Sequence, residues 1–191
     1  MLFSAAAAFL VGHGVGTSER LAANRAARAK EQAVMASMNM TKSAFQAWSL
    51  VCRDWPGNER RCVLFIAVAD PDMKQVLLTF SVARTPQGMP VLLVDTPPGV
   101  TVDQGITVAA GATEAIKVPI QSCGPQRCRA ITELTPSLRT ALERADVTSV
   151  TYVKADNQPS TYNLPTRGFR DGLAAWFAGS DLAAPVSAAV N

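Results

Sequence analysis

The sequence predicts a mainly β domain, an antiparallel sandwich or barrel-like fold with two short helices, preceded by an N-terminal helical segment. Short runs rich in β-branched residues recur along the chain with turn residues between them, as in antiparallel sheets. Four cysteines lie in two close pairs beside such runs. We expect four parts: an apolar leader (1–16), a helical linker or stalk (17–42), a disulfide-stapled β domain (43–179) and a flexible tail (180–191).

The leader, residues 1–16, is apolar and contains no lysine or arginine. It is shorter than the about 20 residues that a helix needs to span a bilayer. It is similar to the hydrophobic region of a secretory signal, but the basic residues that normally precede that region are absent. Three interpretations stay open: a signal peptide with Ala22–Ala23 as one cleavage point, an uncleaved inner-membrane anchor, and a soluble alanine-rich helix.

Residues 17–42 predict a helix, because they are rich in alanine, arginine, glutamate and methionine and contain no glycine or proline. Thr17 or Ser18 can act as its N-cap. The apolar stripe on this helix is thin, so an isolated helix here is marginal unless something packs on it. It is either a linker left after cleavage of the leader or a stalk that carries the domain.

The positive charge of the chain is confined to its beginning. Five of the 18 lysines and arginines, but only two of the 15 acids, precede residue 43, which accounts for the whole net charge of +3. The remaining chain therefore has 13 residues of each sign and is neutral. Nucleic-acid binding needs a basic surface, so we expect no nucleic-acid partner.

From residue 45 onward the pattern changes to short apolar runs separated by turn residues. The runs that we expect to form strands are 45–52, 61–69, 75–83, 90–94, 105–109, 115–121 and 147–153. Thr135 followed by Pro136 predicts the capped start of a helix that extends to residue 145. A second short helix is expected at 170–177.

The cysteine spacing indicates structural disulfides. Nine residues separate Cys52 from Cys62 and four separate Cys123 from Cys128, which does not fit the short CxxC spacing of zinc knuckles, haem attachment or thiol oxidoreductases. Of the three connectivities, local pairing is favoured because each pair would close a hairpin. Disulfides persist in oxidising compartments, so we expect a periplasmic location.

No catalytic constellation is evident in the sequence. The single histidine, His13, lies in the leader, which excludes a histidine-dependent triad in the β domain. We therefore expect no enzyme, no cofactor and no metal site. Trp55, Arg60 and Arg61 in the first cysteine loop are the candidate contact residues, although nearby acids nearly neutralise the two arginines.

Several motifs occur in a characteristic order along the β domain. They are Phe45–Cys52 followed by Arg61–Cys62, Val82–Arg84, Thr96–Val100, the Cys123 and Cys128 pair, and Arg167–Phe169. In this order they resemble the invasion-associated locus B family of proteobacterial periplasmic proteins. The resemblance implies a secreted, disulfide-bonded, mainly β domain without known catalytic residues, in a family associated with host-cell invasion or adhesion.

Together these observations predict a non-catalytic periplasmic or surface interaction protein with a protein partner. The alternative is an accessory subunit tethered to the inner membrane through residues 1–42 and packed on a larger membrane complex. Basic residues that follow an apolar run favour a cytoplasmic domain by the positive-inside rule, whereas the cysteines favour the periplasm. We give the cysteines more weight, because the apolar run is short for a membrane span.

Overall fold

The computed structural model describes residues 20–26, 28, 39–55, 59–72, 74–111 and 113–180. The chain divides into two compact units, residues 1–38 and 39–191. In the first unit, residues 20–26 and 28 are helical and exposed, in agreement with the helix expected there. The expected leader (1–16) and residues 181–191 of the expected tail lie outside the described part.

Residues 40–42, which we expected at the end of the helical linker, form the start of a strand instead. Strand β1 (Met40–Phe45) pairs with β2 (Trp48–Trp55), with Met40 opposite Arg53 and Phe45 opposite Trp48. The backbone hydrogen bonds to a neighbouring strand outweigh the weak helix propensity of a segment without a packed face. The β domain consequently begins at Asn39, not at residue 43.

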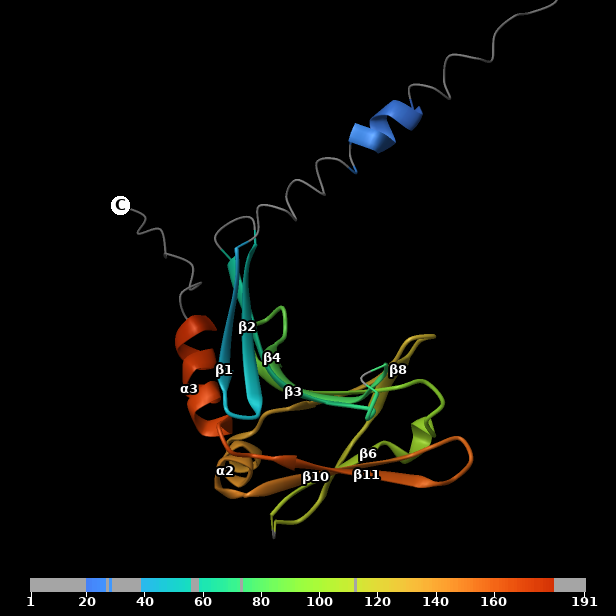
Figure 1. Cartoon of the computed structure of the whole chain (residues 1–191), viewed down its shortest axis with the longest axis vertical. Helices are drawn as coiled ribbons and strands as arrows, with labels where there is room; N and C mark the ends of the chain where they lie inside the picture. Colours follow the sequence, from blue (N-terminus) through green and yellow to red (C-terminus); the bar gives the residue numbers. More distant parts are fainter. Residues whose placement is uncertain are drawn as a thin grey trace, which may run out of the picture. The chain divides into compact units, whose positions relative to one another are not determined.

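The described domain contains two antiparallel sheets (Figure 1). The larger sheet has the order β1-β2-β3-β4-β5-β9-β8, and its further strands are β3 (Glu59–Ala69), β4 (Val76–Arg84), β5 (Pro90–Thr96), β8 (Ile120–Cys123) and β9 (Cys128–Glu133). The smaller sheet has the order β11-β10-β6-β7, with β6 (Ile106–Ala110), β7 (Ile116–Val118), β10 (Val147–Val153) and β11 (Pro159–Pro165).

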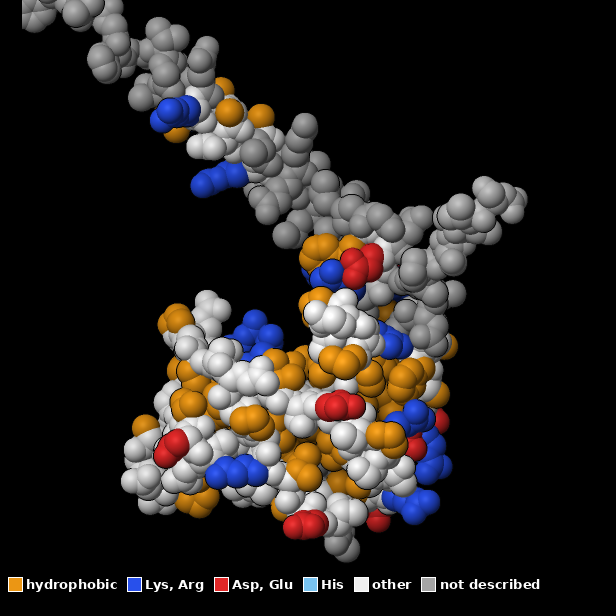
Figure 2. All heavy atoms as spheres, turned by 180° about the vertical axis from the view of Figure 1, so that it is seen from behind, with side chains coloured by type: hydrophobic (Ala, Val, Ile, Leu, Met, Phe, Trp, Pro, Cys, Tyr) orange, Lys and Arg blue, Asp and Glu red, His pale blue; other side chains and the backbone are white. Residues whose placement is uncertain are grey.

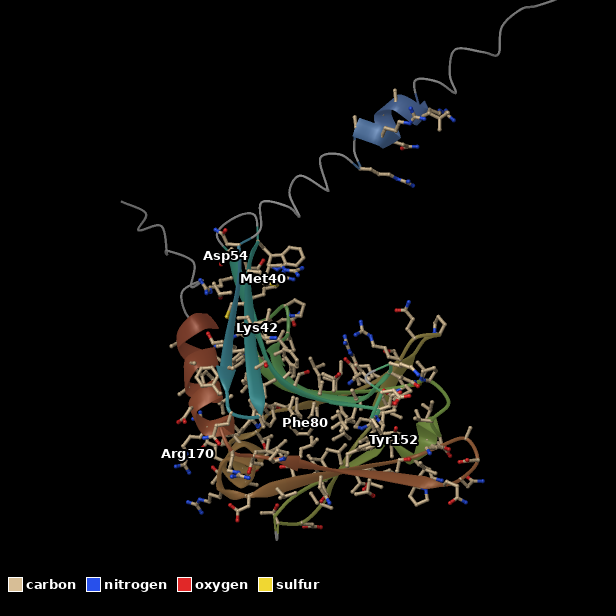
Figure 3. The ribbon with its side chains drawn as sticks, viewed as in Figure 1. Met40, Lys42, Asp54, Phe80, Tyr152 and Arg170 are labelled. Carbon is tan, nitrogen blue, oxygen red and sulfur yellow. A yellow bond between two sulfur atoms is a disulfide. The ribbon has the colours of Figure 1, made fainter. Side chains whose placement is uncertain are left out.

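One face of the larger sheet is buried, and helix α3 (Phe169–Ser180) and the smaller sheet together cover it. Helix α3 packs against β1, β2 and β3, while the smaller sheet faces the remaining strands (Figure 1). Phe80 of β4 and Tyr152 of β10 lie between the two sheets (Figure 3). The expected antiparallel sandwich is confirmed, and the described sheets do not close into a barrel.

Two tryptophans fix the layers to each other. Trp48 is buried, contacts the rings of Phe80 and Phe169, and donates its indole N–H to the carbonyl of Pro165 at 3.1 Å. Trp176 of α3 is also buried and donates to the carbonyl of Cys62 at 2.9 Å. Each buried indole thus satisfies its polar group while its ring fills the core.

The two expected helices are present. Helix α2 (Pro136–Arg144) begins with Thr135 as its N-cap, whose side chain accepts a hydrogen bond from the backbone N–H of Leu138 at 3.3 Å. Helix α3 extends beyond the expected range 170–177 at both ends. Strand β11 was not expected, because it has proline at both ends and a single buried residue, Leu164, which gives little apolar signal.

Candidate interaction surface

Both cysteine pairs form local disulfides, as predicted. Cys52 lies directly opposite Cys62 in the β2–β3 ladder, and Cys123 lies opposite Cys128 in the β8–β9 ladder. The Cα atoms of each pair are 4.0 Å apart. The described residues contain no free cysteine. Each disulfide therefore fixes the register of the hairpin whose strands it joins.

The first disulfide lies beneath α3. Cys52 and Cys62 are 4% and 5% exposed, respectively. A side-chain carbon added at Gly179 of α3 would lie 3.3 Å from the sulfur of Cys62 and 3.5 Å from that of Cys52. The absence of a side chain at this position therefore lets the helix approach the disulfide closely.

We call the part of β1–β3 beyond this disulfide the arm, which comprises residues 40–41, 53–55 and 59–61. The arm extends away from the layer formed by the smaller sheet (Figure 1). Side chains alternate between the two faces of a strand, and Cys52 and Cys62 face α3. The alternation therefore places Arg53, Trp55 and Arg61 on the opposite side, which we call the outer face.

Trp55 and Arg61 contact each other on the outer face. The guanidinium carbon of Arg61 lies 5.0 Å from the centroid of the Trp55 ring, a cation–π arrangement. Arg61 also donates through Nε and Nη2 to both carboxylate oxygens of Glu59, at 2.9 and 3.0 Å. These hydrogen bonds lower the pKa of the Glu59 carboxyl and raise the pKa of Arg61. Both charged side chains are more than half exposed.

Arg60 lies on the other face of the arm. Its Nη2 donates to Thr41 Oγ1 at 3.0 Å, and its Nη1 is 3.6 Å from Asp54 Oδ1. The structure thus brings two of the three candidate contact residues together and separates Arg60 from them. Its partners belong to the arm itself, which indicates that Arg60 holds β1 to the β2–β3 hairpin.

Met40 extends the outer face, and sequence reasoning had not placed it there. It lies opposite Arg53, is 61% exposed, and its sulfur accepts a long contact from Arg53 Nη2 at 3.9 Å. Lys42 follows on the same face, one alternation further along β1 (Figure 3). Apolar, basic and acidic side chains meet at the end of the arm (Figure 2).

A hollow lies at the β8–β9 turn. Its volume is about 420 Å³, and its lining consists of Ser122, Cys123, Gly124, Pro125, Gln126, Arg127 and Arg129. Arg129 makes two hydrogen bonds of 2.7 and 2.8 Å to the carboxylate of Asp95, which raise the pKa of Arg129. Arg127 lies 3.6 Å from the same carboxylate. The residues that line the hollow include no aspartate, glutamate or histidine, so the lining offers no carboxylate or imidazole base.

Within the described part of the chain, no histidines, cysteines, aspartates and glutamates form a group of three that could hold a metal ion. No helix in that part combines the length and the apolar character that a membrane span requires. The outer face of the arm, with Trp55, Arg61, Arg53 and Met40, is the candidate interaction surface.

Comparison with known proteins gave a family and a fold. The family model described as invasion associated locus B (IalB) protein matches residues 48–176. The crystal structure of invasion associated protein B from Bartonella henselae is similar to this chain with a TM-score of 0.63 and 17% sequence identity. The match covers 72% of this chain and 95% of the Bartonella chain. At this identity the likeness shows a shared fold. A search of curated proteins found no match.

Proposed function

The chain belongs to the invasion-associated locus B family, and from this premise we propose that it is a non-catalytic interaction protein of the periplasm or cell surface. The observation that carries the proposal is the outer face of the arm. It presents an exposed arginine, Arg61, in a cation–π contact with Trp55. Its exposed methionine, Met40, contacts Arg53, which lies between Met40 and Arg61 across the paired strands. Tryptophan and arginine are the residue types most enriched among binding hot spots.

The Cys52–Cys62 disulfide and helix α3 order the strands of the arm, which favours binding. The disulfide and α3 hold the strands from the inner face, so the outer side chains lose little further freedom when a partner binds. A surface that is already ordered binds more tightly than a flexible one with the same contacts. We propose that the partner is a protein.

The location rests on the two disulfides. Bonds of this kind are kept in the periplasm or outside the cell and are rare in the cytosol. Labelling the thiols of the denatured, unreduced native protein tests this directly. We expect no labelled cysteine, and four labelled thiols would overturn the proposed location.

The alternative is an accessory subunit tethered to the inner membrane through residues 1–42. The observation that favours it is the division of the chain at Asn39, with helical residues 20–26 and 28 outside the β domain. N-terminal sequencing with membrane fractionation separates the two. Intact Met1 in the membrane fraction supports the tether, and a mature start near residue 23 in the soluble periplasm excludes it.

Site-specific photo-crosslinking in cells tests the binding role of the arm. A photoreactive residue at position 55 should give a discrete adduct with another protein. The matched control is position 161, which is exposed on the smaller sheet, away from the arm. Adducts from position 161 alone, or from neither position, would contradict the proposal.

A further inference from the structure

Strand β1 leaves one edge of the larger sheet open. The backbone N–H of Asp54 donates to the carbonyl of Asn39 at 3.1 Å, so these two residues form a hydrogen-bonded pair. Such pairs alternate along an antiparallel ladder. The N–H and C=O groups of Met40, Lys42 and Ala44 consequently point away from β2. All three residues are exposed, and no strand among the described residues pairs with this edge.

The other three described sheet edges are protected. Strand β11 begins with Pro159 and ends with Pro165, and proline cannot donate to an added strand. Strand β7 has three residues and is followed by Pro119. Strand β8 has four residues and its register shifts before Ser122. Short strands, prolines and irregular register are common protections of sheet edges, and β1 has none of these three; its one charged residue is Lys42, whose charge an acidic segment would neutralise.

The positive charge beside the β1 edge favours an acidic segment as the added strand. The outer face next to β1 carries Lys42, Arg53 and Arg61, and its one carboxylate, Glu59, is already bound to Arg61. A second copy of the chain would bring a second set of cations to the same edge. Like charges close together across paired strands are destabilising, whereas opposite charges stabilise.

We propose that the β1 edge accepts an extended acidic segment of a partner protein as an added strand. This inference rests on the proposed function, because it names the partner chemistry of the same arm. Met40, Lys42 and Ala44 each offer one N–H and one C=O to the added strand. Alternate carboxylates of the segment lie beside Lys42 and Arg53 on the outer face.

The test uses the full chain and defined peptides. The probe is a fluorescein-labelled octapeptide of alternating glutamate and valine, and its control has lysine in place of each glutamate. Amide hydrogen exchange, measured residue by residue by NMR at millimolar peptide, reports where a strand adds. We expect slowed exchange at Met40, Lys42 and Ala44 with the glutamate peptide and none with the lysine peptide.

Two variants separate the contributions of charge and backbone. Lys42→Glu should weaken binding of the glutamate peptide about tenfold, since an attractive cross-strand pair becomes a repulsive one. Lys117→Glu makes the same change of net charge on the exposed face of β7 and should leave binding unchanged. Ala44→Pro removes an outward N–H, a change that an edge strand tolerates, and should abolish the protection. Unchanged thermal unfolding verifies that each variant is folded.

Several results would overturn the inference. The inference fails if the exchange of the β1 amides is not slowed at millimolar glutamate peptide. It also fails if the lysine peptide binds as tightly as the glutamate peptide. Protection of β1 that grows with protein concentration without peptide would assign the edge to a second copy. If crosslinks form from position 55 while these amides stay unprotected, the strand addition fails and the proposed function stands. If position 55 gives no adduct, the proposed function itself fails.

Discussion

Removal of the Cys52–Cys62 disulfide at the base of the arm (the arm disulfide) should lower the free energy of unfolding more than removal of the Cys123–Cys128 disulfide. The perturbation is the double variant Cys52→Ala with Cys62→Ala, compared with Cys123→Ala and Cys128→Ala. Both disulfides lie directly across a hairpin, and both close short loops. The two pairs differ in loop length and in what covers each bond, which is α3 over Cys52 and Cys62, whereas Cys123 is exposed.

The expected magnitude has two parts. The sequence separations are 10 and 5 residues, which give about 2.7 and about 2.1 kcal/mol from chain entropy at 25 °C. Losing a buried sulfur adds about 1 kcal/mol for each site that cannot collapse. Cys52, Cys62 and Cys128 are buried, whereas Cys123 is exposed. The arm pair should therefore cost about 5 kcal/mol and the second pair about 3 kcal/mol.

Urea unfolding of the three proteins at neutral pH measures the difference, with the slope of each transition checked for two-state behaviour. The free energy of unfolding should fall by about 2 kcal/mol more for the arm pair than for the second pair. Equal losses, or a larger loss for the second pair, would refute the claim that α3 and the disulfide together hold the arm.

Two further predictions concern a tight turn and the end of the arm. Gly168→Ala should destabilise the fold by about 2–5 kcal/mol, because the Gly168 backbone is left-handed (φ +88°) and a new side-chain carbon would meet the carbonyl oxygen of Phe45. The control is Gly88→Ala, at a position that is also left-handed but in open space, which should cost about 1–2 kcal/mol. Thermal unfolding measures both losses, and equal losses would exclude the clash at Gly168. The hydrogen bonds to Arg61 lower the pKa of the Glu59 carboxyl. The contribution of this pair to stability is therefore present above the ordinary pKa of glutamate and is lost as the pH falls through the lowered pKa. In an NMR titration, Arg61→Gln should return the pKa of Glu59 toward its ordinary value, and an unchanged pKa would contradict the pairing.

The sequence predicts those features that depend on local chemistry. The Thr135–Pro136 start of α2 and the two disulfide pairings follow from residue types at short spacing, and the structure has both. Strand β1 could not be found in this way, because most of its side chains are exposed on both faces and give no apolar period. Met40, Lys42 and Ala44 are residue types with good helix propensity, and the segment is a strand through its pairing with β2.

The sequence named the candidate contact residues but did not give their arrangement. Trp55, Arg60 and Arg61 are close in sequence, which suggested one cluster. In a strand, however, neighbouring residues point to opposite faces, and the register of the β2–β3 hairpin decides which cross-strand residues meet. The Cys52–Cys62 bond holds that register, in which Asp54 lies opposite Arg60 and Trp55 opposite Glu59, so the separation of Arg60 from Trp55 required the structure.

The central claim is that the outer face of the arm binds a protein partner. Its most direct test is the affinity of the full chain for the protein crosslinked from position 55, measured by calorimetry for wild type, Trp55→Ala and Met89→Ala. Met89 is 53% exposed and lies outside the arm, so its variant controls for the loss of an exposed apolar side chain. We predict that Trp55→Ala weakens binding by about 2 kcal/mol, roughly 30-fold, with Met89→Ala unchanged. Equal affinities for wild type and Trp55→Ala would contradict the claim.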